Sequence, residues 1–458
     1  MSIKTKYFGT DGFRGEANIE LTAEHAFKIG RFLGWYYNQI SQSKPRIIIG
    51  KDTRKSSYML EYAVAAGITS SGADAYMVHV TTTPSISFVV KQDDFDCGIM
   101  ITASHNPFTD NGIKLINRQG EKLEDAVIAL IETYLDGDLV KLGITAADIP
   151  LAFGSDIGTI VDYTSGRSRY VDYLISLATQ SYGNIKIGID CANGASWMIA
   201  KTVFDALGAR TYLIGTHPNG TNINDNCGST HTETLRAIIK ENKLDLGFAF
   251  DGDADRCIAI DENGNVVDGD KILYILAKRL KRQYLLSGNT IVATVLSNLA
   301  LINALSKESI KCETTAVGDK YVYARMLEND YQLGGEQSGH IIMRQYSTTG
   351  DALITAIMLT EEMLDRKCSF SKLCEHLILY PQMTKNYKVF DKSAVVNDET
   401  IMKQLAKIND NLGKKGRILL RASGTENLIR IMAESQTQEE CESLIKQIEK
   451  LLKERDYL

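Results

Sequence analysis

The sequence predicts an α/β protein with three repeated α/β domains followed by a separate α+β domain. Three stretches share one plan, in which an apolar run, a polar turn, a helix-like segment and a second apolar run follow one another, at 46–80, 185–215 and 290–318. Each is a βαβ unit, which places a helix against a largely parallel sheet. After about residue 375 the pattern changes to alternating strands and a strongly periodic helix, which is typical of an α+β domain.

The elements follow in order along the chain. The first copy begins at "RIIIGK" and the second at "IKIGID", and in both the predicted helix ends at Gly-Ala. The third copy, "TIVATVLSNLALINALSKESIKCETTAVG", lacks the Gly-Ala. A further strand follows each copy, so we expect mixed sheets. "NYKVF" and "GRILLRASGTENLIRIMAE" predict antiparallel strands, and the last helix is predicted in "TQEECESLIKQIEKLLKERDYL". The expected domain limits are 1–155, 156–256, 257–372 and 373–458.

Composition and charge favour a soluble globular protein. The 458 residues are 44% hydrophobic and 24% charged, with a formal net charge of −6. This charge gives no reason to expect nucleic acid or an anionic membrane as a partner. The eight cysteines form no C-x-x-C pair and most lie in apolar runs, which predicts reduced thiols and a cytoplasmic protein. "MSIKTKYFGT" lacks the apolar core of a signal peptide, and we expect no membrane span.

A polar, glycine-rich loop follows the corresponding strand of each repeat. The loops are TASHNP (102–107), DGDADR (251–256) and GEQSGH (335–340). In open α/β sheets, ligands bind beyond the carboxyl ends of the strands, so three such ends can converge on one cleft if the repeats pack side by side. Taken alone, each loop is more typical of an ordinary turn.

Three roles are open to Ser104 in the first loop: hydrolase nucleophile, phosphate carrier or cap of the next turn. Adjacent serine and histidine side chains usually point apart, so we expect His105 to be poorly placed to activate Ser104. No G-x-S-x-G motif surrounds the serine. Lys114 lies ten residues further along and is a candidate partner, although lone basic residues are usually solvated.

The second loop is a candidate metal site. Asp251, Asp253 and Asp255 stand at i, i+2 and i+4 on a loop that leaves a predicted strand, and such an open set of carboxylates that shares a phosphate oxygen fits Mg²⁺. An EF-hand loop also has acids at its first, third and fifth positions, and Glu262 falls at the twelfth. Two features exclude an EF-hand. Its sixth position requires glycine, where this chain has Arg256, and helices flank an EF-hand loop, whereas strands are predicted here. Simple turn formation is the remaining alternative.

Two further loops offer binding groups. In RASGTEN (421–427), backbone N–H groups can form an anion nest to which Arg421 adds a bidentate fork, and Arg430 lies just beyond. A plain hairpin turn explains this loop equally well. In GEQSGH, Glu336 and Ser338 can hydrogen-bond a polyol.

TASHNP, DGDADR, GEQSGH and RASGTE occur in this order over the whole chain, and the combination resembles the α-D-phosphohexomutase superfamily. Members have three α/β domains of related topology and a fourth, flexible α+β domain around one central cleft. The resemblance implies that Ser104 is a phosphoserine, which donates its phosphoryl group to a sugar phosphate. The bisphosphorylated sugar then turns over in the cleft and returns its original phosphoryl group to the serine.

The resemblance also implies the roles of the other site residues. Mg²⁺ is assigned to the phosphoserine with Asp251, Asp253 and Asp255, and the sugar hydroxyls to Glu336 and Ser338. The residues implied at the reacting centre are Arg14, His105, Lys114, Arg256 and His340, with Lys114 as the proton-transfer group. Those implied for the non-reacting phosphate are Arg421, Ser423, Gly424, Thr425 and Arg430.

Within the superfamily the chain most resembles the phosphoglucosamine mutase branch. The marks are "YFGTDGFRG", "SHNPFTDNGIK", Gln337 within GEQSGH, and "VGDKY", whose Gly318 and Asp319 we expect beside the substrate. An ammonium at C2 of the sugar would favour a nearby carboxylate such as Asp319. Ala422 and Asn427 stand where the branch commonly has proline, and Phe13 replaces a more usual aliphatic residue.

This branch implies interconversion of glucosamine 6-phosphate and glucosamine 1-phosphate, with a sugar 1,6-bisphosphate as activator, feeding UDP-N-acetylglucosamine and cell-wall synthesis. The implied partner is a small sugar phosphate, and the implied assembly is a monomer or homodimer. One alternative is a phosphomannomutase or phosphoglucomutase of the same superfamily. Another is a phosphatase-like or non-catalytic sugar-phosphate binder, which the presence of both Ser104 and the three aspartates disfavours.

Overall fold

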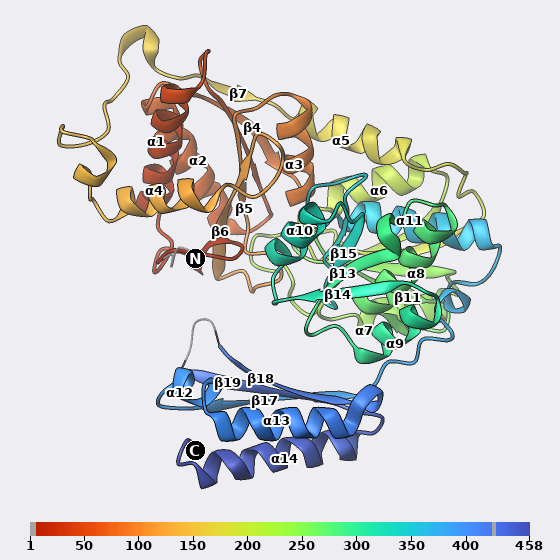
Figure 1. The fold of residues 1–458 in the computed structure, drawn as a ribbon. Coiled ribbons are helices and arrows are strands. Elements are labelled where there is room, and N and C mark those ends of the chain that lie inside the picture. Colours follow the sequence, from red (N-terminus) through yellow and green to blue (C-terminus); the bar gives the residue numbers. More distant parts are fainter. Residues whose placement is uncertain (1–5, 424–426) are drawn as a thin grey trace. The chain divides into compact units, whose positions relative to one another are not determined.

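The computed structural model describes residues 6–423 and 427–458. The chain forms two compact units, one of residues 1–295 and 313–374 and the other of residues 296–312 and 375–458 (Figure 1). In the described part of the chain, none of the helices has the length and apolar character that crossing a membrane requires.

The first sheet of the larger unit has the order β1-β2-β6-β5-β3-β4-β7. Its strands are β1 (Phe8–Gly9), β2 (Gly12–Glu16), β3 (Arg46–Lys51), β4 (Asp74–Val80), β5 (Cys97–Ile101), β6 (Asp110–Asn117) and β7 (Ile160–Asp162). β3 runs parallel to β4 and β5, whereas β6 runs antiparallel to β5 and β2. The mixed sheet therefore contains the predicted βαβ unit.

Helices cover both faces of this sheet because its central strand is apolar on both sides (Figure 1). They are α1 (Ala23–Ile40), α2 (Lys55–Ser70), α3 (Thr83–Gln92) and α4 (Asp125–Leu135), with short 3₁₀ turns η1 (Val140–Leu142) and η2 (Gly154–Asp156). Ile47 and Ile49 share a buried core with α1, α2 and α4, whereas Ile48 packs on the opposite face with α3.

The second sheet has the order β12-β11-β10-β8-β9. Its strands are β8 (Lys186–Asp190), β9 (Arg210–Ile214), β10 (Leu246–Phe250), β11 (Cys257–Asp261) and β12 (Val266–Val267), and its helices are α5 (Ser165–Ser176), α6 (Trp197–Ala206) and α7 (Glu233–Asn242). β10 pairs antiparallel with β11, and DGDADR forms the turn between them. The expected domain limit between residues 256 and 257 therefore falls inside a paired hairpin.

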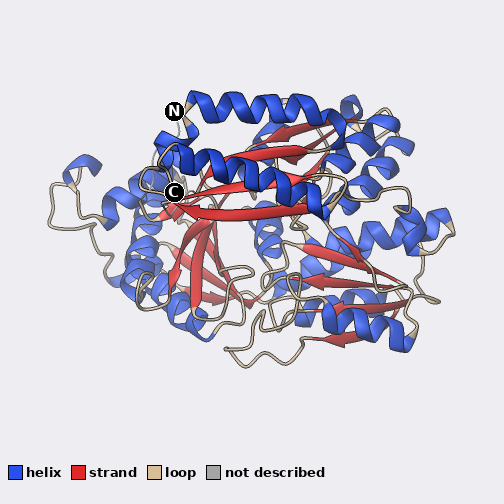
Figure 2. Ribbon diagram, turned by 90° about the horizontal axis from the view of Figure 1, so that it is seen from below, coloured by secondary structure: helices blue, strands red, loops and turns tan. Residues whose placement is uncertain are grey.

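The third sheet has the order β14-β13-β15-β16. Its strands are β13 (Thr290–Thr294), β14 (Lys311–Thr315), β15 (Leu333–Gly335) and β16 (Ile341–Met343). The helices of this region are α8 (Gly269–Arg282), α10 (Asp319–Glu328) and α11 (Ala352–Arg366), with η3 (Ser287–Asn289) and η4 (Phe370–Leu373). Figure 2 shows helices flanking the strands.

The smaller unit is an α+β domain with an antiparallel sheet of order β17-β19-β18. Its strands are β17 (Gln382–Lys388), β18 (Arg417–Ala422) and β19 (Leu428–Glu434), and its helices are α9 (Leu299–Lys307), α12 (Lys392–Val396), α13 (Glu399–Leu412) and α14 (Gln438–Glu454), with η5 (Gly413–Lys415). Apolar residues of α13 and α14 form its core with the sheet.

One helix of the third repeat belongs to this smaller unit, whereas the sequence placed it within 257–372. The backbone N–H of Leu299, at the start of α9, donates to Glu434 Oε1 at 2.5 Å. The side chain of Asn298 donates to the carbonyl of Tyr380 at 2.9 Å. These contacts join α9 to the C-terminal sheet, so the two units are not consecutive segments of the chain.

Candidate active site

Ser104 lies in the loop after β5 and points at the carboxylate loop of the second sheet. Its side chain is buried, and its Oγ donates to Asp251 Oδ2 at 2.5 Å. Its φ of +53° is uncommon for a residue with a side chain, and backbone strain of this kind clusters at functional sites. Its own N–H donates to Thr102 Oγ1 at 3.0 Å. This geometry disfavours the capping role, because the hydroxyl contacts an acidic side chain of another sheet.

His105 lies closer to Ser104 than the sequence predicted. Its Nδ1 is 3.4 Å from Ser104 Oγ, so the expectation that the two side chains point apart is wrong. The loop turns sharply at Ser104, where φ is positive, and this brings the neighbouring side chains to one side. Burial, followed by the positive charges of Arg256 and Arg14, lowers the pKa of His105 to about 4. The imidazole is therefore neutral at neutral pH.

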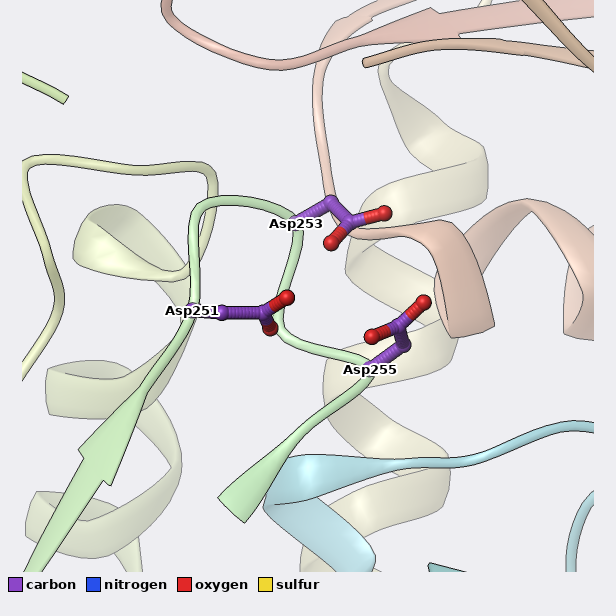
Figure 3. Close-up of side chains that lie close together, drawn as sticks. All are labelled: Asp251, Asp253 and Asp255. Atoms are coloured by element: carbon purple, nitrogen blue, oxygen red, sulfur yellow. The ribbon is translucent and has the colours of Figure 1, made fainter. Parts of the chain in front are cut away.

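Asp251, Asp253 and Asp255 direct their carboxylates toward one another in the turn between β10 and β11 (Figure 3). Their potential ligand atoms all lie within 4.8 Å of one another, and all three side chains are buried. Burial, followed by repulsion from Asp255 and Asp253, raises the pKa of Asp251 well above its ordinary value. A divalent cation would relieve this repulsion.

The carboxylate cluster fits a hard cation better than a closed network of hydrogen bonds. Among the described residues, no group hydrogen-bonds Asp253 Oδ1, although the atom is fully buried. A buried carboxylate oxygen without a partner is costly, and a metal ligand bond would satisfy it. The flanking elements are strands, so the structure excludes an EF-hand helix pair, and Glu262 is engaged by Ser371.

Lys114, on β6, contacts two of these carboxylates. Its Nζ lies 2.9 Å from Asp253 Oδ2 and 2.9 Å from Asp255 Oδ2, and the side chain is buried. Burial alone would lower the pKa of Lys114, but Asp11, Asp253 and Asp255 raise it well above its ordinary value. The lysine is therefore a buried ammonium, not the solvated surface residue that a lone lysine usually is.

Asp11 and Lys122 belong to this cluster, although the sequence analysis did not select either one. Asp11 forms an ion pair with Arg14 and lies 3.3 Å from Lys114 Nζ and 3.0 Å from Lys122 Nζ. Asp11 stands inside "YFGTDGFRG", so the motif contained a signal for it. Lys122 stands in no recognisable pattern.

The third loop meets the other two through His340 and Asp319. His340 Nδ1 lies 3.6 Å from Asp255 Oδ1, and its Nε2 lies 3.6 Å from Asp319 Oδ2. Asp319 Oδ1 in turn accepts from Lys122 Nζ at 2.7 Å. The carboxyl ends of the three repeats thus converge, as the sequence predicted. Asp319 is engaged by a lysine of the chain, which weakens its predicted role as the partner of a sugar ammonium.

Glu336 connects the sugar-loop motif to the segment that precedes α10. Its Oε1 accepts from the N–H of Gly318 at 3.0 Å, and Ser338 is exposed on the same turn. Arg256 donates its backbone N–H to Asp251 Oδ1 at 3.1 Å, and its guanidinium lies 4.0 Å from Asp255 Oδ1. The predicted residues of the larger unit are therefore brought together in one region.

The predicted phosphate loop lies in the smaller unit. Arg421 on β18 and Arg430 on β19 are register partners, and burial, followed by the charge of Arg430, lowers the pKa of Arg421. Ser423 is buried, and its carbonyl accepts from Lys392 Nζ at 2.7 Å. Gly424 and Thr425 lie outside the described residues. Several cationic groups thus surround the start of this loop.

Comparison with known families accounts for nearly the whole chain. Models of phosphoglucomutase/phosphomannomutase domains match in the expected order: α/β/α domain I at 5–139, domain II at 168–264, domain III at 268–380 and the C-terminal domain at 385–451. The chain belongs to this phosphohexomutase family. Both the recognised superfamily and the predicted fold class are confirmed.

Two full-length relatives belong to the same branch of the family. A phosphoglucosamine mutase of Lachnospira eligens is 54% identical over 453 residues, which are 99% of each chain. A phosphoglucosamine mutase of Bacillus subtilis is 46% identical over 443 residues, which are 97% of each chain. Both relatives are full-length matches, so the family likeness covers all four domains.

Solved structures of the family share the fold at low sequence identity. A phosphoglucomutase/phosphomannomutase family protein from Burkholderia thailandensis has a TM-score of 0.79 at 22% identity, covering 98% of this chain and 97% of that one. N-acetylphosphoglucosamine mutase of Aspergillus fumigatus, solved with GlcNAc-6P and magnesium, has a TM-score of 0.67 at 16% identity, covering 97% and 95%.

Proposed function

We propose that this chain interconverts glucosamine 6-phosphate and glucosamine 1-phosphate, with Ser104 as the phosphoryl carrier. The observation that carries the proposal is the 2.5 Å contact between Ser104 Oγ and Asp251 in a strained, buried loop. Full-length likeness to phosphoglucosamine mutases supports the choice of substrate. A sugar 1,6-bisphosphate would start the cycle by phosphorylating the serine.

We assign a Mg²⁺ site to Asp251, Asp253 and Asp255 together with the phosphate on Ser104. Two observations support this assignment: the buried Oδ1 of Asp253 has no partner among residues 6–423 and 427–458, and the carboxylates lie close together. When bound, the ion neutralises charge on the transferring phosphoryl group and its serine oxygen. Phosphoryl transfer leaves little covalent work for the protein, so positioning by the loop is the main contribution of the chain itself.

Proton transfer is assigned to Lys114. In the first half-reaction a sugar hydroxyl forms a P–O bond as the bond from phosphorus to Ser104 Oγ breaks. The departing oxygen gains a proton from the Lys114 ammonium, whose raised pKa keeps it protonated, and the sugar hydroxyl's proton restores the lysine. The second half-reaction reverses these events at the other phosphate, which returns to Ser104.

Each unit by itself contains groups that are proposed to bind the sugar or its non-reacting phosphate. In the larger unit, Glu336 and Ser338 would contact the sugar hydroxyls, and Gly318 and Asp319 are also assigned to substrate binding. The cationic and imidazole groups of the reacting centre are Arg14, His105, Arg256 and His340. In the smaller unit, the non-reacting phosphate is assigned to Arg421, Ser423, Gly424, Thr425 and Arg430. The facing pair Arg421 and Arg430 supports an anion site.

The test is a comparison of kcat/KM on glucosamine, glucose and mannose 1-phosphates, each with its own bisphosphate activator. A hydrogen bond to a charged group contributes about 1.5–3 kcal/mol, so we expect a preference of about ten- to a hundredfold for glucosamine over glucose phosphate. Fastest turnover of mannose phosphate would overturn the assignment in favour of a phosphomannomutase. Release of inorganic phosphate without an isomerised sugar would indicate a phosphatase.

A further inference from the structure

The backbone of the Ser104 loop is held from two domains at once. The carbonyl oxygen of Ser104 accepts from Arg54 Nη2 at 3.1 Å and from Asn224 Nδ2 at 2.8 Å. The carbonyl of Asn106 accepts from the same two groups, at 2.6 Å and 3.1 Å. Arg54 belongs to the first domain and Asn224 to the second, so each carbonyl is shared between them.

Contacts within its own turn hold the Arg54 side chain in place. Its side chain is fully buried between β3 and α2 and forms an ion pair with Asp52. Asp52 Oδ1 also accepts from the N–H of Arg54 at 2.9 Å and from Ser57 Oγ at 2.8 Å. The guanidinium is thus oriented by its own turn, and its Nη2 donates to the carbonyls of the serine loop.

Asn224 is fixed from the other side. It lies between β9 and α7 with a φ of +58°, and its N–H donates to the carbonyl of Ala192 at 2.9 Å. A side chain at Gly252 would place Cβ 2.6 Å from the Ser104 carbonyl and 3.0 Å from Asn224 Nδ2. The contact is therefore closely packed.

Neighbouring residues add further hydrogen bonds between the first and second domains. The N–H of Lys55 donates to the carbonyl of Gly220 at 2.9 Å, and Thr53 Oγ1 donates to the carbonyl of Asn193 at 2.6 Å. The turn at residues 52–55 is therefore hydrogen-bonded to the loops of the second sheet, and Arg54 in the same turn is hydrogen-bonded to the serine loop. A shift between the first two domains would move the Ser104 backbone.

We infer that Asn224 and Arg54 are positioning residues for phosphoryl transfer, and that Asn224 couples the serine to the second domain. This inference rests on the proposed function. Ser104 adopts a left-handed conformation that the surrounding structure has to maintain. In-line transfer tolerates little displacement of the attacked or departing oxygen, and a shift of ~1 Å lowers the rate by about a hundredfold. Four hydrogen bonds to two carbonyls restrain that displacement.

The decisive variant is Asn224→Asp, which keeps the size and the left-handed tolerance of the residue. It replaces the donor by an acceptor that faces two carbonyl oxygens. The matched control is Asn226→Asp in the same loop, because Asn226 also has a positive φ, of +52°, but is exposed and donates only to Asp225 Oδ1 among the contacts seen. We expect Asn224→Asp to lower kcat about ten- to a hundredfold with KM within about twofold.

The same experiment follows phosphorylation of Ser104 by a sugar bisphosphate in a single turnover, by mass spectrometry. This rate should fall in parallel with kcat for Asn224→Asp and remain within twofold of the parent for Asn226→Asp. A lower Tm with unchanged kcat and phosphorylation rate would mean that Asn224 is merely structural, and would overturn the inference. The proposed function can fail separately. If the unaltered chain does not isomerise glucosamine phosphate, but Ser104 is still phosphorylated at different rates in the two variants, the proposed function is refuted and the inference about Asn224 is not.

Discussion

Arg421 on β18 lies directly opposite Arg430 on β19, so two guanidinium groups share one face of the antiparallel pair. Like charges in facing positions destabilise a sheet, and among the described residues the buried Nε of Arg430 has no hydrogen-bond partner. An anion bound between the two groups, as in the proposed phosphate site, would offset this repulsion.

Arg430→Gln should therefore affect the thermal stability of the chain and its binding of the sugar phosphate in different ways. We expect Tm to stay constant or rise, because the repulsion is removed, and KM for the sugar phosphate to rise about ten- to a hundredfold with the loss of a charged hydrogen bond. Steady-state kinetics and thermal melts measure the two effects. Lys385→Gln on β17 is the control, since it removes one positive charge from the same sheet but pairs with Glu449. Equal effects of both variants on KM would contradict the phosphate site.

Ser104→Ala should lower turnover by several orders of magnitude, because the covalent step is lost. Phosphopeptide mapping of the parent after incubation with a sugar bisphosphate should find the phosphate on Ser104. Mapping to another residue, together with full activity of Ser104→Ala, would refute the phosphoserine.

Chelation should abolish isomerisation, and added Mg²⁺ should restore it. Asp253→Asn should raise the Mg²⁺ concentration needed for half-maximal activity, because it removes the buried oxygen that has no partner in the described part of the chain. Glu262→Gln is the matched control: Glu262 would be a ligand in an EF-hand, but here it binds Ser371. A shift of the Mg²⁺ requirement in Glu262→Gln and not in Asp253→Asn would contradict the proposed site.

Asp319→Asn distinguishes two roles of Asp319. If the carboxylate mainly orients Lys122, as the 2.7 Å contact indicates, kcat/KM should fall by a similar factor for glucosamine and glucose phosphates. A selective loss for glucosamine phosphate would instead assign Asp319 to the C2 ammonium. The measurement is the ratio of the two kcat/KM values in parent and variant.

The sequence predicted the site best where the chemistry is local. Asp251, Asp253 and Asp255 stand at alternate positions of one turn, so their spacing alone places them together. Arg54 and Asn224 could not be found in this way, because they lie 50 and 120 residues from Ser104 and act on its backbone. No pattern of residue types marks a side chain that contacts a distant carbonyl.

The fold, like the site, could be predicted from the sequence only in part. The apolar runs of the repeats gave the strands, since a strand covered on both faces is apolar throughout. The placement of α9 was not predictable, because its amphipathic pattern is that of any βαβ helix. Its assignment to the smaller unit depends on contacts with residues far along the chain, such as those of Leu299 with Glu434 and of Asn298 with Tyr380.

The C-terminal domain is consequently not a detachable module. A fragment of residues 375–458 would leave Glu434 without the Leu299 N–H and the Tyr380 carbonyl without Asn298. A chain shortened at residue 374 would keep α9 but remove the sheet that binds it. Domain exchange between family members therefore has to preserve the contacts between residues 296–312 and the C-terminal segment. These residues lie between β13 and β14, so they cannot be moved with the C-terminal segment without cutting the third sheet.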